Sequence, residues 1–275
     1  MTPARTLPES GPMPIEAVPP AGLPEQLRAF LKQGAEELSI ALDDEALGRF
    51  DIYLRELLIW NKKHNLTAIR EPSEIVARHF LDSLTCTQGY DFTIARQIID
   101  VGAGAGFPGL PLKIAFPSLQ ITLLDSSIKK VEFLTHLCPL LGFPDVDVVH
   151  CRAEEFGHVG SYRQRFYLAV ARAVAPLPVL AEFCLPFVTV GGYFLAQKNL
   201  ELGEELTEAT KAFTALGGGD PVTIPVTVPG TDLQRSLIRV RKESPTPSRY
   251  PRRPGIPAKR PIGTAAAERM HPKYR

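Results

Sequence analysis

The sequence lacks an apolar run long enough to cross a membrane, because no stretch approaches roughly 18 uninterrupted apolar residues. Cysteine is also scarce: Cys86, Cys138, Cys151 and Cys184 lie far apart and form no CxxC pair. This spacing argues against a disulfide framework and a zinc site, and it favours buried thiols in a reducing compartment. Residues 1–22 carry prolines where a secretion signal has its apolar core. We therefore expect a cytoplasmic protein with no membrane contact and no bound metal.

The 275 residues are 44% hydrophobic, which is enough for a sizeable core, and their net charge of +1 hides an asymmetry. Residues 245–275 hold eight Lys or Arg and one Glu, a charge of +7, so residues 1–244 carry −6. This tail is rich in proline, which blocks helices and central strands. It is either a disordered, solubilising tail or an arm that follows an RNA backbone. In the second case the candidate RNA contacts are Arg252, Arg253, Lys259 and Arg260.

Two kinds of hydrophobic pattern follow one another along the chain. The first part has helical spacing, and the predicted helices are 23–40, 43–65 and 73–84. From residue 97 the apolar runs become short and rich in branched side chains. The predicted strands are 97–101, 120–125, 146–150, 166–173 and 191–198, with helices at 109–116, 128–142, 177–188 and 201–219. Segments 221–228 and 235–242 predict a hairpin.

Alternating strands and helices predict an α/β fold with a mostly parallel sheet, closed by an antiparallel C-terminal hairpin. A helical subregion precedes this sheet. The expected divisions are a disordered proline-rich N-terminus (1–23), a helical region (24–90), an α/β domain (91–244) and the basic tail (245–275).

The stretch "DVGAGAGFPGLPLKI", residues 100–114, joins the first strand to the first helix of the sheet, on the edge where such sheets bind ligands. Gly104, Gly106 and Gly109 match the dinucleotide pattern, and Asp125 lies at the distance expected for a ribose contact. Asp100 favours another ligand, because a carboxylate repels a pyrophosphate but suits a cationic or amine group. S-adenosylmethionine carries a sulfonium, an amine and a ribose diol, and no phosphate.

We therefore expect S-adenosylmethionine, held by Asp100, Gly102, Gly104 and Gly106, with Asp125 on the ribose. An oxidoreductase that uses a nicotinamide dinucleotide is the alternative enzyme, and turn glycines without a ligand are the structural alternative.

Several ordered motifs resemble one known family. These are "WNKKHNLTAIREPSEIVARHFLDSL", "DVGAGAGFPGLPLKI", "LLDSSIKKVEFL", "CRAEEF" and "ARAVAPL", which run from about residue 45 to 200. They resemble the RsmG (GidB) family, which methylates N7 of a guanine in bacterial 16S ribosomal RNA. The resemblance implies a class I methyltransferase sheet, S-adenosylmethionine as cofactor, and 16S rRNA or the 30S subunit as partner. Separately, we expect the enzyme to be a monomer. The cofactor residues it implies are Gly102, Phe107, Asp125, Ser126, Ser127, Ala153, Glu154 and Arg172.

Methyl transfer to N7 needs no general base, because neutral guanine carries a free lone pair there; the enzyme has to align the reacting atoms. Arg172 follows a strand at the binding edge and is the candidate catalytic residue, with a salt bridge to Glu154 or Asp125 as the alternative. His79 and Asp82 share a helix face and are interpreted as a packed pair, or as part of a helix that covers the cofactor pocket.

Two residues outside the tail are candidate RNA contacts, namely Arg152 and Lys198. Trp60 is expected to pack between helices. A non-catalytic RNA-binding protein remains the alternative to an enzyme.

Overall fold

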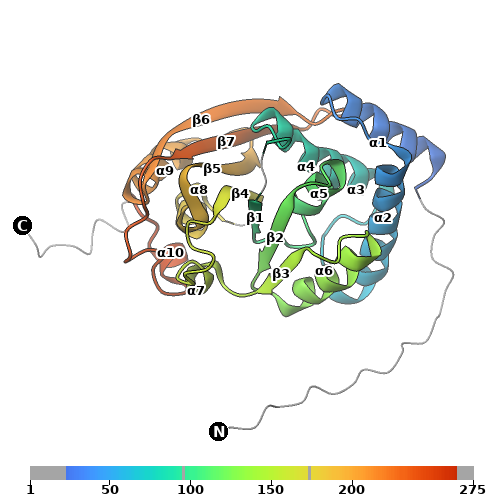
Figure 1. Ribbon diagram of the computed structural model, residues 1–275. Helices are drawn as coiled ribbons and strands as arrows, with labels where there is room; N and C mark the ends of the chain where they lie inside the picture. The colour runs from blue at the N-terminus through green and yellow to red at the C-terminus, as the bar shows by residue number, and fades with distance from the viewer. Residues whose placement is uncertain (1–22, 95–96, 173–174, 265–275) are drawn as a thin grey trace, which may run out of the picture.

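The structure, a computed structural model, describes residues 23–94, 97–172 and 175–264, and Figure 1 shows its sheet with helices on both faces. The α-helices are α1 (Glu25–Glu37), α2 (Asp44–His64), α3 (Pro72–Ile75), α4 (Asp82–Leu84), α5 (Gly109–Ala115), α6 (Ile128–Leu140), α7 (Ala153–Phe156), α8 (Leu177–Cys184), α9 (Glu204–Ala215) and α10 (Ile256–Lys259). The strands are β1 (Gln97–Val101), β2 (Gln120–Asp125), β3 (Asp147–His150), β4 (Phe166–Arg172), β5 (Val188–Asn199), β6 (Gly218–Thr227) and β7 (Gln234–Lys242).

The strands form one sheet in the order β3-β2-β1-β4-β5-β7-β6. The pairs among β1 to β5 are parallel, and β7 runs antiparallel to both β5 and β6. Pro221 and Pro225 lie in β6, at the sheet edge, where a missing N–H costs no ladder bond. The predicted mostly parallel sheet with its closing antiparallel hairpin is confirmed.

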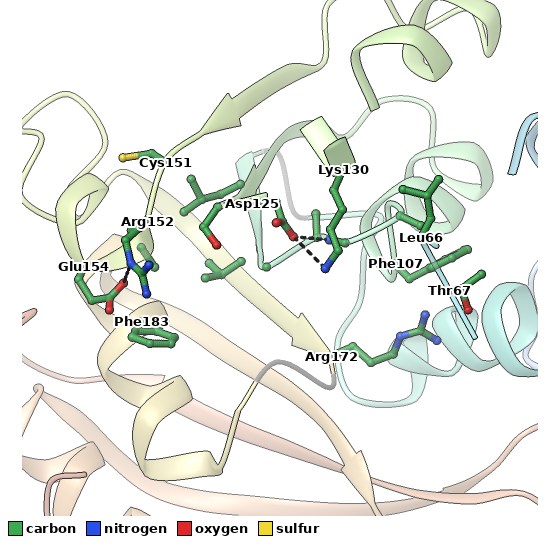
Figure 2. A pocket seen from close by; sticks show the side chains of 18 of the residues that line it. Leu66, Thr67, Phe107, Asp125, Lys130, Cys151, Arg152, Glu154, Arg172 and Phe183 are labelled. Atoms are coloured by element: carbon green, nitrogen blue, oxygen red, sulfur yellow. Dashed lines mark hydrogen bonds and ion pairs between the residues drawn. The ribbon is translucent and has the colours of Figure 1, made fainter. Parts of the chain in front are cut away.

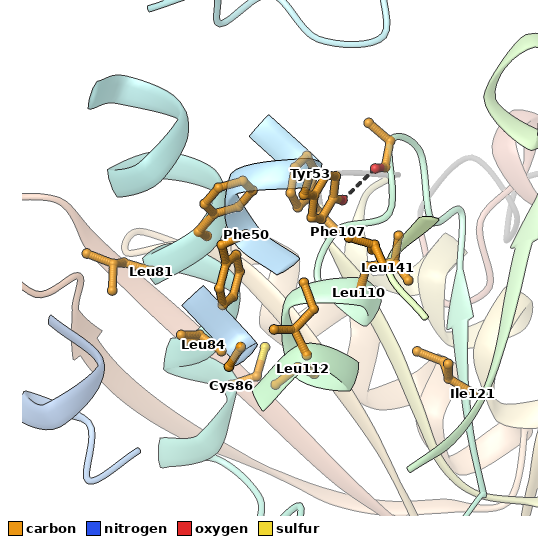
Figure 3. Packing of buried hydrophobic residues seen from close by; sticks show 14 of the residues in the cluster. Phe50, Tyr53, Leu81, Leu84, Cys86, Phe107, Leu110, Leu112, Ile121 and Leu141 are labelled. Atoms are coloured by element: carbon orange, nitrogen blue, oxygen red, sulfur yellow. Dashed lines mark hydrogen bonds between the residues drawn. The ribbon is translucent and has the colours of Figure 1, made fainter. Parts of the chain in front are cut away.

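Two hydrophobic cores lie on the two faces of the sheet, because successive strand residues point to opposite sides. Ile98 packs into the core under α2, α5 and α6, whereas its neighbour Ile99 packs into the core under α8 and α9. Figure 3 shows the first core around Phe50 and Leu110. The helical N-terminal region therefore belongs to the same hydrophobic core as the glycine loop.

The predicted helix 73–84 is not a single α-helix. A π-helical segment, Val76–Leu81, separates α3 from α4, and a 3-10 turn, Thr85–Gln88, follows them. A second 3-10 turn, Leu185–Phe187, connects α8 to β5. Hydrophobic spacing does not distinguish a π turn from an α turn over so few residues, and π turns are frequent at functional sites.

The tail differs from the expected free segment over its described part, residues 245–264. Arg252 donates to the fully buried carboxylate of Glu182, with 2.6 Å between Nη2 and Oε2. Arg163 donates to the backbone carbonyls of Thr246, Pro247 and Tyr250. Proline removes backbone donors but leaves carbonyls and side chains able to bind the body, so the expectation of an unattached arm is wrong here.

We call residues 245–264 the C-terminal strap. Residues 265–275, and residues 1–22 of the predicted disordered segment 1–23, lie outside the described residues. Leu23, the last residue of that segment, is buried, and its amide donates to Asp51. In the part of the chain that the structure describes, no helix is long and apolar enough to span a bilayer, and no group of His, Cys, Asp and Glu is arranged to hold a metal.

Candidate functional site

The glycine loop leaves β1 at Val101 and turns sharply into α5. The amides of Gly102 and Ala103 donate to the carbonyl of Leu124, at 2.8 and 3.0 Å, so the loop is attached to β2. Gly106 has a φ of 103°, and a Cβ there would lie 2.6 Å from the hydroxyl of Tyr53. That hydroxyl donates to the carbonyl of Ala105, at 2.6 Å, so helix α2 holds the loop in place. Figure 3 shows this contact.

Asp125, at the end of β2, is the polar centre of the site. Its Oδ2 accepts the Gly104 amide and its Oδ1 accepts the Ser127 amide, each at 2.8 Å. Lys130 lies 3.9 Å from the same carboxylate. Each carboxylate oxygen keeps a second lone pair, so Asp125 fixes the loop and can still accept from a ligand.

Asp100 lies beneath the loop and does not line the cavity, unlike the sequence-based expectation. It is fully buried, and its Oδ2 accepts the Gly109 amide at 2.8 Å. Burial raises its pKa to about 7, against the opposing effects of the Gly109 amide and Arg172. The pattern placed Asp100 at the correct end of β1 but could not show on which side of the loop its carboxylate lies.

The start of α5 does not present amides to a pyrophosphate. The Gly109 amide donates to Asp100, the Leu110 amide to the Gly106 carbonyl, and the Leu112 amide to the Pro108 carbonyl; residue 111 is proline. Phosphate binding at a helix start needs such amides. The start of α5 therefore does not suit a dinucleotide. Asp100 contributes to this by occupying the Gly109 amide, and not by repelling a pyrophosphate directly.

A cavity of about 360 Å³ opens at the carboxyl ends of β1, β2 and β4. Figure 2 shows Asp125 in its middle, between Arg152 and Glu154 on one side and Phe107 and Thr67 on the other. Among the predicted cofactor residues, those that line it are Gly102, Gly104, Phe107, Asp125, Ser126, Ala153, Glu154 and Arg172. Gly106 and Ser127 lie beside it and shape it through Tyr53 and Asp125.

The lining also includes residues that the sequence analysis did not assign to the site: Leu66, Thr67, His79, Val101, Ala103, Ala105, Leu124, Lys130, Cys151 and Phe183. Leu66 and Thr67 lie in the "NLTAIR" part of a motif that resembles the family. That resemblance is the sequence signal that could have placed them at the site. The helical region thus closes one side of the cavity, as the alternative interpretation of the His79 helix predicted.

Arg172 ends β4 and is held from several directions. Its Nη1 donates to Asp82 Oδ2 at 3.0 Å and to the Arg78 carbonyl at 3.2 Å, and its guanidinium lies 4.9 Å from the centre of the Phe107 ring. The alternative ion-pair partners Glu154 and Asp125 are therefore wrong, and Asp82 is the partner. Asp82 is buried and also binds Arg235, with 3.1 Å between Oδ1 and Nε.

His79 lies between Arg172 and Phe107, with its ring stacked on Phe107 at 4.4 Å between centroids. Nδ1 accepts from Arg172, at 3.2 Å, which assigns the proton to Nε2, and Nε2 donates to the Thr67 hydroxyl at 2.8 Å. Burial, together with the charge of Arg172, lowers the pKa of His79 to about 3. The imidazole is therefore neutral, and it pairs with Arg172 rather than with Asp82.

The candidate RNA contacts fall into two groups. Lys198 pairs with Glu205 at 2.7 Å and donates to the Ala175 carbonyl, and Arg252 is bound to Glu182. The exposed group consists of Arg152, Arg253, Lys259 and Arg260. Arg152 lies 3.8 Å from Glu154, whose other oxygen accepts the amide of Gly255 in the strap. Trp60 packs against Phe133 and His136, as expected.

The family model described as rRNA small subunit methyltransferase G matches residues 47–235. A relative of that name from Alkaliphilus metalliredigens is 48% identical over 235 residues, which cover 86% of this chain and 98% of the relative. One from Geobacillus thermodenitrificans is 46% identical and covers 82% of this chain and 95% of the relative. A predicted O-methyltransferase structure from Agrobacterium tumefaciens aligns with a TM-score of 0.47 at 21% identity, over 60% of this chain and 80% of that one.

The matched residues begin in α2 and end in β7, so they contain the helix that holds the glycine loop, the loop itself, Asp125 and Arg172. On this match, the chain belongs to the rRNA small subunit methyltransferase G family.

Proposed function

We propose that this protein transfers a methyl group from S-adenosylmethionine to N7 of a guanine in 16S ribosomal RNA. The observation that carries the proposal is the cavity around Asp125, closed by Arg172 and His79, in a chain of this family. The substrate is 16S rRNA, free or in the 30S subunit, so the enzyme acts in the cytoplasm. We propose that it acts there as a monomer.

The residues of the cavity fit S-adenosylmethionine. Asp125 offers lone pairs for ribose hydroxyls, and Ala153 and Glu154 line the far end, where the adenine would lie. Gly104 has a φ of 62° and its Cβ position is open, with the nearest atom 3.9 Å away, so a side chain there would enter the cavity. Glycine therefore keeps both the turn and the space.

When bound, the cofactor supplies a methyl group on a sulfonium. The N7 lone pair of guanine would form the new bond to the methyl carbon while the carbon–sulfur bond breaks and its electron pair stays on sulfur as a thioether, so no residue has to remove a proton. Arg172 and His79 fix the wall at which the two reactants meet, and a neutral His79 places no positive charge on its ring beside a base that becomes cationic. The work of these residues is alignment and control of charge.

The proposal is tested by transfer of labelled methyl from S-adenosylmethionine to unmodified 16S rRNA and to 30S particles, with the modified atom mapped. Label at N7 of one guanine supports it, and the better substrate shows whether assembly is required. RNA binding without transfer to either substrate would favour the non-catalytic alternative. Reduction of a nicotinamide dinucleotide without methyl transfer would favour the oxidoreductase.

A further inference from the structure

The C-terminal strap binds two elements of the cofactor cavity from outside it. Arg252 donates from Nη2 to Glu182 Oε2 at 2.6 Å and from its amide to Oε1 at 2.7 Å. Three residues later, the Gly255 amide donates to Glu154 Oε1 at 3.0 Å. Glu182 lies in α8 beside Phe183, and Figure 2 shows Phe183 and Glu154 at the same end of the cavity that both line. The strap therefore joins α7 to α8 where the adenine would lie.

The two carboxylate oxygens of Glu154 differ. Oε1 accepts from the strap, whereas Oε2 makes no hydrogen bond with a described residue, and Arg152 Nε lies 3.8 Å from it. In the described part of the chain, the side-chain atoms buried without a hydrogen-bond partner are Tyr90 Oη, Asp100 Oδ1 and Gln197 Oε1. Glu154 Oε2 is not among them, so it keeps accessible surface. Because Glu154 lines the cavity, Oε2 is an acceptor that a bound ligand can reach.

The donor to Oε1 follows from the sequence Pro254–Gly255–Ile256–Pro257. The two prolines carry no N–H, and the Ile256 amide donates to the Arg253 carbonyl at 3.0 Å. Gly255 has a φ of 80°, in the left-handed region that favours glycine. This glycine therefore supplies both the turn of the strap and the one amide that binds Glu154.

Resting on the proposed function, we propose that the strap is a positioning element of the cofactor site. The Gly255 amide fixes the carboxylate of Glu154 so that Oε2 accepts the 6-amino group of the adenine. A purine with oxygen at C6 would present a lone pair to Oε2 instead. Arg152 competes only weakly for the orientation of Glu154, because its side chain is 54% exposed and its charge is screened by solvent. A segment whose described residues do not line the cavity thereby helps to select the purine.

The test measures binding of S-adenosylhomocysteine and of S-inosylhomocysteine, which has oxygen in place of the 6-amino group, by isothermal titration. Wild type is expected to bind the adenine form roughly tenfold to 100-fold more tightly, the range of one hydrogen bond to a charged group. In Glu154→Gln the Gly255 amide holds Oε1, so Nε2 faces the purine and the preference should invert toward S-inosylhomocysteine. Glu155→Gln is the matched control, because exposed Glu155 does not line the cavity, and it should keep the wild-type preference.

Adding Gly255→Pro to Glu154→Gln removes the amide donor and the left-handed turn, while Arg252 keeps its bonds to Glu182. The glutamine can then turn its oxygen to the 6-amino group, so the preference should return to S-adenosylhomocysteine. A strap that only supported packing would weaken binding of both ligands together and would not invert the preference between them.

A Glu154→Gln variant that still prefers S-adenosylhomocysteine would overturn the inference, since its side chain would not be fixed by the strap. An inversion that persists after Gly255→Pro would overturn it too. If the double variant does not fold, Glu154→Gln alone decides. Equal binding of the two ligands by wild type would also overturn the positioning role and leave the proposed function standing. Wild type that binds neither ligand and transfers no methyl group would instead overturn the proposed function.

Discussion

Arg172, which lines the cavity around Asp125, and Asp82, 90 positions away in the chain, form an ion pair of 3.0 Å. Asp82 is 2% exposed, and Arg235 from β7 is the other cation on the same carboxylate. The helical region therefore supplies the anion that binds both the end of β4 and the start of β7. This pair connects the stability of the fold to the shape of the site.

Replacing Arg172 with alanine should reduce both stability and activity. Arg235 still compensates Asp82, so we expect a loss of about 1–3 kcal/mol in the free energy of unfolding, as for a lost charged hydrogen bond. Methyl transfer should fall about 100-fold, because the reactants meet at a wall of the cavity that has lost the side chain of Arg172. Unfolding curves measure the loss of stability. Initial rates of methyl transfer, taken well below the melting temperature, measure the loss of activity in folded protein. Activity lost only in proportion to the unfolded fraction would reduce Arg172 to a structural role, and exposed Arg241→Ala provides the control.

Asp125→Ala should weaken binding of S-adenosylmethionine by roughly 1–3 kcal/mol, because ribose hydroxyls lose a charged acceptor. The variant should also lose some stability, since the amides of Gly104 and Ser127 lose their acceptor. Isothermal titration measures the affinity. Asp147→Ala is the matched control. Asp147 is the first residue of β3, at the amino ends of the strands, and it does not line the cavity. An unchanged dissociation constant in Asp125→Ala would remove Asp125 from the cofactor site.

The strands were predictable because their apolar, branched residues leave a clear signal, and the ordered motifs placed Asp125 and Glu154 at the cavity. The role of Asp100 was not predictable, because the side of the loop on which its carboxylate lies depends on how α5 is oriented. The strap was missed for a similar reason: composition shows that prolines prevent regular structure, but not that Arg252 has a buried partner in Glu182. Long-range ion pairs such as Arg172–Asp82 have no local signature.

The low pKa of His79 predicts a loss of stability in acid. The folded-state pKa is about 3 and the ordinary value is 6.5, so below pH 6.5 the unfolded chain binds a proton that the folded chain does not. This contribution is complete above pH 6.5 and is lost as the pH falls toward 3. Asp100, whose pKa is raised to about 7, acts in the opposite direction, since its destabilising effect grows as the pH rises from 3.8 to about 7.

The difference between wild type and His79→Gln isolates the histidine, because glutamine stays neutral and can still donate and accept. Between pH 6.5 and about pH 5 the wild type should lose about 1–2 kcal/mol more than the variant. Urea unfolding at several pH values measures this difference. Parallel pH curves for the two proteins would show that His79 titrates normally in the folded state.

Arg252 and Arg253 are neighbours in the strap with opposite expected behaviour. Arg252→Ala leaves Glu182 fully buried without its cation, so the free energy of unfolding should fall by about 2–4 kcal/mol. Arg253 is exposed, and Arg253→Ala should change stability by less than about 0.5 kcal/mol. Thermal and urea unfolding of the two variants measure this contrast. Similar small effects in both would mean that the strap is not bound to the body in solution.

The exposed cations of the strap should contribute to RNA binding without supporting the fold. Deleting residues 245–275 cannot test this cleanly, because the deletion also removes Arg252 from Glu182 and Gly255 from Glu154. Replacing Arg253, Lys259 and Arg260 with glutamine leaves those contacts in place. Each lost phosphate contact should make the slope of log affinity against log salt shallower by about 0.7–0.9, so the triple variant should lose about 2–3 in slope.

Filter binding of 16S rRNA at several salt concentrations measures these slopes, and titration with S-adenosylmethionine should give equal affinities for the two proteins. Glu201→Ala, which removes an exposed charge of opposite sign outside the strap, should not flatten the slope. Equal slopes for wild type and the triple variant would show that RNA binding does not use the strap. The contribution of the strap would then be its packing on Glu182 and Glu154, which supports α7 and α8 beside the cavity.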